Sequence, residues 1–325
     1  MVELLVAAGI SFIVTVLAGL ALIPFLRRLK FGQTILEIGP AWHMSKQGTP
    51  TMGGLMFMTG VTAAVLFAGY GLVREGVYAH LYVLMLAWLF GAIGFIDDYC
   101  KVKRKQNEGL TATQKLALQA AVGVAFLALM RYIGYLTPDL YIPFFAASWR
   151  MDWVVFLIFS IFLVVGMVNA VNLTDGVDGL CAGITLPVAV FFAAAALAWS
   201  KPELSLTAAA LGGGMAGFLV YNFHPAKVFM GDTGSLFIGG LICGLAFALD
   251  APVLMIVTGA VYILEMFSVI LQVGYFKLTR GKRLFKMSPL HHHFEKSGWP
   301  EVKIFAVFTL ATALICAATY CFGLK

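Results

Sequence analysis

Long apolar runs separated by short polar segments make up most of the sequence. Windows of about 20 apolar residues, the length at which a helix spans a bilayer, recur about ten times. The expected helices cover residues 4–26, 54–72, 77–96, 113–133, 153–171, 179–199, 204–221, 235–249, 252–276 and 304–322. The pattern predicts an all-α, polytopic integral membrane protein with about ten transmembrane helices.

Three of the expected helices are unusual. The helix at 113–133 begins with polar residues that include Lys115, so its first turns should be wet. The helix at 235–249 is short for a crossing. The helix at 252–276 is long and carries Glu265 near its middle, which indicates a tilt, a bend or a side turned towards protein. No internal repeat is evident, so residues 1–325 are expected to form a single domain.

Composition agrees with this class, since 61% of the 325 residues are hydrophobic and 12% are charged. The five cysteines are scattered and odd in number, which indicates neither a disulfide framework nor a zinc site. Glu3 stands where a signal peptide carries positive charge, so the first apolar run is expected to be a retained span.

The basic residues predict the orientation. Of the 22 Lys and Arg residues, 17 fall on one side of the expected helices, which places that side in the cytoplasm and both termini outside. The net charge of +6 therefore lies where anionic lipid headgroups and anionic substrates would meet it, and it requires no nucleic acid partner.

Four polar clusters, at residues 97–98, 172–178, 222–232 and 291–293, fall on that same cytoplasmic side. Acidic residues on the opposite side occur singly. We therefore expect the four clusters to form one site at the cytoplasmic face of the membrane.

Each cluster has its own chemistry and its own alternative. Asp97 and Asp98 are expected to end a helix, where the dipole opposes them, so a divalent ion or nearby lysines should offset their charge; a solvated pair is the alternative. Asp175 and Asp178 resemble the start of a calcium loop without its later ligands, and Asp178 could instead cap the next helix.

The later clusters also leave alternatives open. Asp232 lies near a helix N-terminus, where it could hold a ligand or act as a cap, and Phe229 could stack on a planar ring or pack in the core. His291, His292 and His293 lack helical ligand spacing and suit Mg²⁺ poorly. They favour phosphate contact or proton handling, with a solvated run as the alternative.

Six segments occur together in an order that is typical of one enzyme family. They are residues 48–54, 94–99, 172–179, 222–226, 229–235 and 289–295. In these segments the chain resembles the bacterial phospho-N-acetylmuramoyl-pentapeptide transferases, a branch of the polyprenyl-phosphate N-acetylhexosamine-1-phosphate transferase superfamily. Residues 48–54 and the His-His-His-Phe-Glu run point to the muramoyl branch.

The resemblance implies a reaction and a location. The family transfers phospho-N-acetylmuramoyl-pentapeptide from UDP-MurNAc-pentapeptide to undecaprenyl phosphate with Mg²⁺, which gives lipid I and UMP for peptidoglycan synthesis. The implied location is the bacterial plasma membrane, with the active site on its cytoplasmic face. Dimers occur in the family, and the sequence leaves open whether this chain forms a homodimer.

The resemblance also implies roles for individual residues. Asp232 would be the leading Mg²⁺ ligand with Asp175 beside it, and the catalytic group would be Asp97, Asp98, Asp232 and His291. The implied substrate-binding residues are Lys46, Lys101, Lys105, Asn172, Asp175, Asp178, Asn222, Phe229, His292 and His293.

Other classes fit less well. A transporter needs charges near the middle of the bilayer, where only Glu265 is expected, and a prenyl transferase needs a second aspartate-rich motif. The closest alternative is a sister transferase that uses UDP-N-acetylglucosamine or another UDP-hexosamine.

Overall fold

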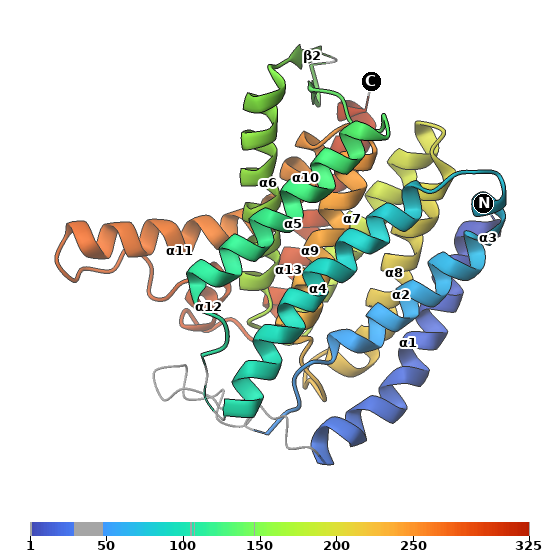
Figure 1. The fold of residues 1–325 in the computed structure, drawn as a ribbon. Helices are drawn as coiled ribbons and strands as arrows, with labels where there is room; N and C mark the ends of the chain where they lie inside the picture. Colours follow the sequence, from blue (N-terminus) through green and yellow to red (C-terminus); the bar gives the residue numbers. More distant parts are fainter. Residues whose placement is uncertain (1, 29–47, 105, 107, 146, 325) are drawn as a thin grey trace.

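The computed structural model describes residues 2–28, 48–104, 106, 108–145 and 147–324 (Figure 1). The long helices are α1 (Val2–Arg28), α2 (Gly54–Ala68), α4 (Ala79–Arg104), α5 (Ala112–Tyr132), α6 (Trp153–Thr174), α7 (Leu180–Ala198), α8 (Pro202–Asn222), α9 (Gly231–Ala248), α11 (Ala260–Leu278) and α13 (Glu301–Ala318). Short helices are α3 (Tyr70–Arg74), α10 (Val253–Thr258), α12 (Leu290–Glu295) and the π-helical turn η2 (Thr319–Gly323).

The all-α membrane architecture is confirmed. Within the described part of the chain, nine helices are long and apolar enough to cross a membrane, and α2 is a shorter apolar helix. Each of the ten expected helices has a counterpart, because a chain in lipid has to satisfy its backbone groups within the segment.

Helix α9 lies at the centre of the bundle. It packs mainly against α4 and α6, and every residue from 233 to 248 is buried. The outer layer includes α1, which packs on α2 and α8, and α13, which packs on α7. The central helix therefore has no face of its own for lipid, and its first turn is held in a fixed protein environment.

Two helix boundaries differ from the sequence prediction. Helix α4 was expected to end at residue 96, but it continues to Arg104, so Asp97 and Asp98 lie inside the helix rather than at its end. Lys101, Lys103 and Arg104 occupy its last turn, where they interact favourably with the helix dipole. Helix α9 begins at Gly231, before the expected start at residue 235. Hydropathy marks the apolar part of a helix and not its hydrogen-bonded ends.

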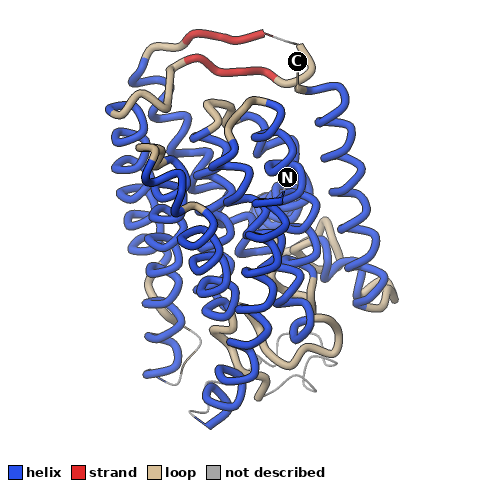
Figure 2. Tube along the Cα trace, turned by 90° about the vertical axis from the view of Figure 1, so that its right-hand side faces the viewer, coloured by secondary structure: helices blue, strands red, loops and turns tan. Residues whose placement is uncertain are grey.

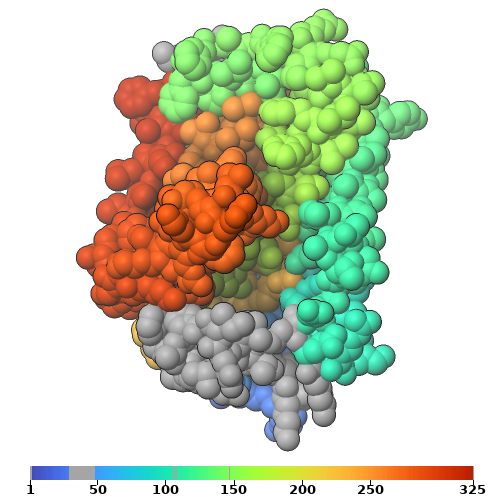
Figure 3. Space-filling model, turned by 90° about the vertical axis from the view of Figure 1, so that its left-hand side faces the viewer, coloured from blue at the N-terminus to red at the C-terminus, as the bar shows by residue number. Residues whose placement is uncertain are grey.

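The long ninth apolar segment is both bent and turned towards protein. It divides at Gly259 into α10 and α11, and α11 projects from the body of the bundle (Figures 1 and 3). Glu265, on the first half of α11, is completely buried. Both features agree with the expectations drawn from its length and its acidic residue.

A small hairpin was not expected. Strands β1 (Asp139–Ile142) and β2 (Ala147–Arg150) pair antiparallel, with Asp139 opposite Arg150. Figure 2 shows this hairpin across one end of the bundle, beside the C-terminus. The Tyr141 hydroxyl ties it to η2 by donating to the carbonyl of Gly323 at 2.6 Å.

Candidate active site at the other end of the bundle

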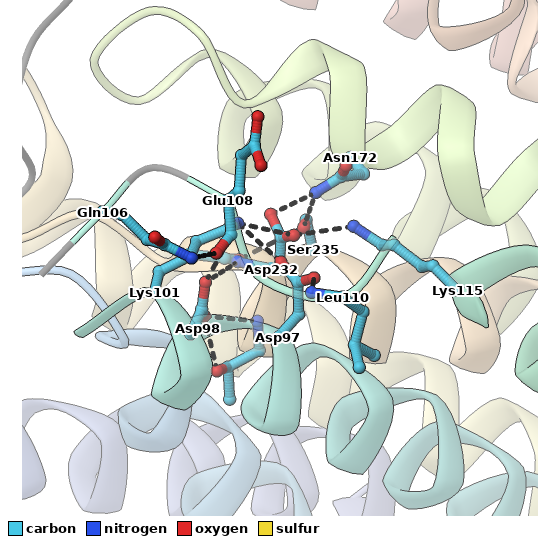
Figure 4. A network of polar contacts seen from close by, with 12 residues as sticks. Asp97, Asp98, Lys101, Gln106, Glu108, Leu110, Lys115, Asn172, Asp232 and Ser235 are labelled. Atoms are coloured by element: carbon cyan, nitrogen blue, oxygen red, sulfur yellow. Dashed lines mark hydrogen bonds and ion pairs between the residues drawn. The ribbon is translucent and has the colours of Figure 1, made fainter. Parts of the chain in front are cut away.

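Three carboxylates meet where α4 passes the first turn of α9. Asp97 and Asp98 come from α4 and Asp232 from α9, and one oxygen of each lies within 4.8 Å of the others (Figure 4). Two segments separated by more than a hundred residues are therefore brought together, as the sequence predicted. The carboxylates lie at the end of the bundle away from the hairpin.

Two glycines allow this close approach. A Cβ at Gly94 of α4 would collide with the backbone carbonyl of Asp232. Gly231 has a φ of 70°, and a Cβ there would lie 2.5 Å from Oδ2 of Asp98. Only glycine suits a left-handed backbone with a carboxylate so close. These two positions set the separation of α4 and α9.

Asp98 acts as a cap for α9 from a neighbouring helix. Its Oδ2 accepts hydrogen bonds from the backbone N–H of Thr233 at 2.9 Å and the hydroxyl of Thr233 at 2.7 Å. Its Oδ1 accepts from the N–H of Asp232 at 3.3 Å. Helix α9 has no cap from its own N-cap residue, Met230. The alternative that Asp232 caps its own helix is therefore wrong, because a carboxylate of α4 supplies the acceptors.

Two lysines bind the carboxylates. Lys101 Nζ lies 2.6 Å from Asp97 Oδ2 and 3.0 Å from Asp232 Oδ2. Lys115 Nζ lies 2.6 Å from that same Asp232 oxygen. Three carboxylates against two ammonium groups leave one formal negative charge in excess. The alternative of a solvated Asp97–Asp98 pair is wrong, since both are 3% exposed and paired.

Lys115 was missed as a site residue. In the sequence its polarity indicates only a wet first turn of α5, whereas in the structure its side chain reaches Asp232 on α9. The feature of the sequence that indicates a site role for Lys115 is a charged side chain at the start of an apolar helix. Lys46 and Lys105, the other lysines expected to face phosphates, lie outside the described residues.

Asn172, at the end of α6, completes the cluster. Its amide donates to Asp232 Oδ1 at 2.8 Å and to Ser235 Oγ at 2.8 Å. Asp97 Oδ1 accepts from the N–H of Leu110 at 2.8 Å, which fixes the approach to α5. Helices α4, α5, α6 and α9 therefore all contribute to one site (Figure 4).

Asp178 and Asn222 form a separate cluster. Asp178 is buried; its Oδ2 accepts from the N–H of Ala226 at 2.9 Å and lies 3.1 Å from Nδ1 of His224. Glu301 Oε2 accepts from the N–H of Asp178 at 3.2 Å. Gly179, in a left-handed conformation, is the N-cap of α7, so the alternative that Asp178 caps this helix is wrong.

Asn222 and Phe229 connect the loops around this second cluster. Asn222 accepts from the N–H of Gly179 at 3.1 Å and donates to the carbonyl of Val228 at 2.8 Å. Phe229 is half-buried, and its backbone binds Pro50 and Gly53. The sequence stretch that begins at residue 48 is thereby held beside the loop before α9.

The three histidines face three different partners. His291 is buried against Glu265 of α11. His292 Nδ1 contacts Glu295 Oε2 at 2.5 Å, and His293 Nδ1 accepts from the N–H of Lys286 at 3.1 Å. None of these contacts reaches the three carboxylates, so His291 does not join Asp97, Asp98 and Asp232 through any described contact.

Asp175 lies between the two clusters. It follows α6, and its carboxylate makes no hydrogen bond with a described residue. Burial raises the pKa of Asp175 well above its usual value, and the charges of Asp232, Asp98 and Asp178 raise it further. Ionised Asp175 therefore costs folding free energy in the unliganded protein.

We expect Asp175→Asn to raise the thermal unfolding midpoint of the unliganded protein near neutral pH. A carboxyl whose pKa is raised on folding favours the folded state at low pH and loses that contribution as pH rises through its folded pKa. The gain should therefore shrink as pH falls towards about 4, because Asp175 in the unfolded chain also begins to take up its proton there. Midpoints of both proteins measured from pH 4 to 8 test this, and a gain that stays constant across that range would contradict it.

The donor set suits a hard divalent cation. Carboxylate oxygens are the ligands that Mg²⁺ prefers, and the three-carboxylate cluster presents several of them with a negative charge in excess. The cluster of Asp178, His224 and Glu301 also gathers metal-ligating groups, but one of them is a histidine, which suits Mg²⁺ less well.

Comparison with known proteins gives two family matches. The model of glycosyl transferase family 4 matches residues 80–250. The phospho-N-acetylmuramoyl-pentapeptide-transferase signature 1 matches residues 46–58.

Curated relatives match over nearly the whole chain. A phospho-N-acetylmuramoyl-pentapeptide-transferase of Clostridium acetobutylicum is 44% identical and covers 96% of both chains. That of Desulforudis audaxviator is 43% identical, over 100% of this chain and 99% of the relative. That of Halalkalibacterium halodurans is 48% identical, over 94% of this chain and 93% of the relative.

Proposed function

This chain belongs to the phospho-N-acetylmuramoyl-pentapeptide-transferase family, and we propose that it transfers phospho-N-acetylmuramoyl-pentapeptide from its UDP-linked donor to undecaprenyl phosphate. The products are lipid I and UMP, and the reaction serves peptidoglycan synthesis in a bacterial cell membrane.

The observation that carries this proposal is the group of three carboxylates and two lysines at one end of an apolar helical bundle. Joining a water-soluble nucleotide to a membrane lipid requires a site at the membrane surface. Phosphoryl transfer depends mainly on positioning and on neutralising charge, and this group provides fixed charges of both signs.

The chain's own residues position these charges. Lys101 and Lys115 both hold the same oxygen of Asp232, so an anionic phosphate that approaches this oxygen also meets two ammonium groups. Asn172 holds the other oxygen of Asp232 and fixes the plane of its carboxylate. Asp98 keeps α9 against α4 and thereby keeps Asp232 beside Asp97.

Mg²⁺ is the proposed cofactor. Asp232 would be its leading ligand, and Asp97 and Asp98 lie near enough to contribute. Asp175, between the carboxylate cluster and the cluster of Asp178 and Asn222, is the further candidate ligand. When bound, the ion supplies charge neutralisation for the phosphates of the donor.

Direct in-line attack by the lipid phosphate is the proposed mechanism. The alternative is a covalent phospho-enzyme on an aspartate. Direct attack requires fewer separate steps at the crowded cluster, where the described oxygens of Asp97, Asp98 and Asp232 already have partners. Isolation of enzyme that retains the sugar phosphate after releasing UMP in the absence of lipid would overturn direct attack.

Asp97 is proposed to orient charge rather than to remove a proton. The acceptor is a phosphate monoester whose second pKa is about 6, so it is mostly dianionic at neutral pH. Both Asp97 oxygens are engaged, by Lys101 and by the N–H of Leu110.

We expect the turnover deficit of Asp97→Asn to persist as pH rises from about 7 to about 9, where the acceptor is fully ionised. Recovery of turnover at high pH would show that Asp97 acts as a base.

The nucleotide is proposed to bind beside the second cluster. Asp178, Asn222 and Phe229 lie on connected loops there, with Asp175 between them and the carboxylates. His292 and His293 are proposed to contribute to substrate binding, as are Lys46 and Lys105. The excess of basic residues at this end supports a cytoplasmic active site with both termini outside.

One assay tests the proposed function against its closest alternative. Purified protein is supplied with undecaprenyl phosphate and either UDP-MurNAc-pentapeptide or UDP-N-acetylglucosamine, with Mg²⁺ or with EDTA, and UMP release is measured. We expect release only with the muramoyl donor and Mg²⁺. Release with UDP-N-acetylglucosamine alone would favour the sister transferase.

A further inference from the structure

Glu265 is an acid with no role in the chemistry described above. It lies on α11, the helix that projects from the bundle, and none of its surface is exposed. Burying a carboxylate is costly unless it is paired and hydrogen-bonded. Among the described residues, the partner of its carboxylate is His291 of α12.

Glu265 holds both the backbone and the ring of His291. Its carboxylate accepts from the backbone N–H of His291 at 3.2 Å and lies 3.1 Å from the ring Nδ1. A carboxylate only accepts, so Nδ1 carries the hydrogen and Nε2 points away from Glu265. Two attachments on one residue fix the direction of the ring.

The ring of His291 is directed at the loop that carries Asp175. Nε2 of His291 is buried without a hydrogen-bond partner among the described residues, and it lies against Gly176. A Cβ at Gly176 would collide with Nε2. The imidazole therefore packs directly on the backbone next to Asp175.

We propose that Glu265 is a positioning residue, which holds His291 against Gly176 and thereby fixes the loop at residues 172–179 for nucleotide binding. This inference rests on the proposed function, because that function places the nucleotide at this loop. Glu265 would thus affect substrate affinity through His291, without contact to the nucleotide or to the carboxylate cluster.

Binding of UMP to the purified full-length protein, measured by calorimetry with Mg²⁺ present, tests the proposal. We expect Glu265→Ala to weaken UMP binding about tenfold, since two buried donors of His291 lose their acceptor. Glu265→Gln keeps one acceptor oxygen and should lie between Glu265→Ala and the unsubstituted protein. In a His291→Ala background, Glu265→Ala should have no further effect on affinity.

Gln272 offers a matched control on the same helix. Its amide oxygen accepts from Leu284 at 3.0 Å and from Phe285 at 2.9 Å, so it also ties α11 to the following loop without touching His291. We expect Gln272→Ala to lower the thermal midpoint and to leave UMP affinity unchanged. Equal losses of affinity in both variants would overturn the proposal, as would additive effects of Glu265→Ala and His291→Ala.

Amide hydrogen exchange separates this inference from the proposed function. If the unsubstituted protein does not bind UMP, the proposed function fails, and exchange at residues 172–179 then decides the inference alone. Faster exchange there in Glu265→Ala than in Gln272→Ala supports the positioning role. Equal exchange in the two variants overturns it.

Discussion

An Asp232→Asn variant should lose about a thousandfold in turnover while it keeps its fold. Asp232 receives Lys101, Lys115 and the amide of Asn172, so its charge organises most of the cluster. An amide of the same shape removes this charge and with it the negative excess of the cluster, and Lys115 loses its carboxylate partner among the described residues. Initial rates of UMP release at saturating donor and lipid measure the effect.

Asp152 provides the control for an aspartate change that does not affect the site. It caps the opposite end of α6, where its Oδ1 accepts from the N–H of Val154 at 2.9 Å. Asp152→Asn should change turnover by less than about twofold, because asparagine is an equally good cap. Turnover by Asp232→Asn within about tenfold of the unsubstituted protein would rule out a central charge at Asp232.

A Gly94→Ala variant should lose activity almost completely through one added methyl group. The new Cβ would meet the backbone carbonyl of Asp232, and two packed helix backbones cannot yield as a flexible side chain would. Separation of α4 from α9 would move Asp97 and Asp98 away from Asp232. We expect a loss of about 1 to 3 kcal/mol in stability, together with a fall in turnover of about a hundredfold.

Gly274 on α11 is the matched control, since a Cβ there would have no heavy atom within 4 Å. Gly274→Ala should be neutral or slightly stabilising, because alanine favours a helix by about 1 kcal/mol over glycine. Thermal midpoints and UMP release are measured for both variants. Equal behaviour of the two would show that α4 and α9 do not need this close contact.

Most of the membrane architecture was predictable from hydropathy. Each apolar run contains a helix, because a helix satisfies its backbone hydrogen bonds within the segment in lipid. The length of the segment at 252–276 and its Glu265 predicted the bend and the side turned towards protein. The ends of α4 and α9 were not, since backbone hydrogen bonds continue beyond the apolar side chains that hydropathy detects.

The site was predictable only where its residues occur in groups. Asp97, Asp98 and Asp232 lie in conspicuous polar motifs, and the structure brings them together. Lys115 and Glu265 each stand alone in an apolar helix, so only the packing of that helix reveals their partners. The sequence predicts that the three histidines join the carboxylates, but their described contacts are with other residues. The order of residues along the chain does not give the distance between the two groups.

The burial of α9 has a consequence for how this protein should unfold. Asp232 stands on the first turn of a helix whose residues from 233 to 248 are all buried, so the amides of α9 should be among the last in the chain to exchange with solvent. The cluster of Asp97, Asp98 and Asp232 would then persist until the bundle opens as a whole. Partial denaturation should release α11 first and weaken nucleotide binding, whereas the contacts of Asp232 should be lost only on global unfolding.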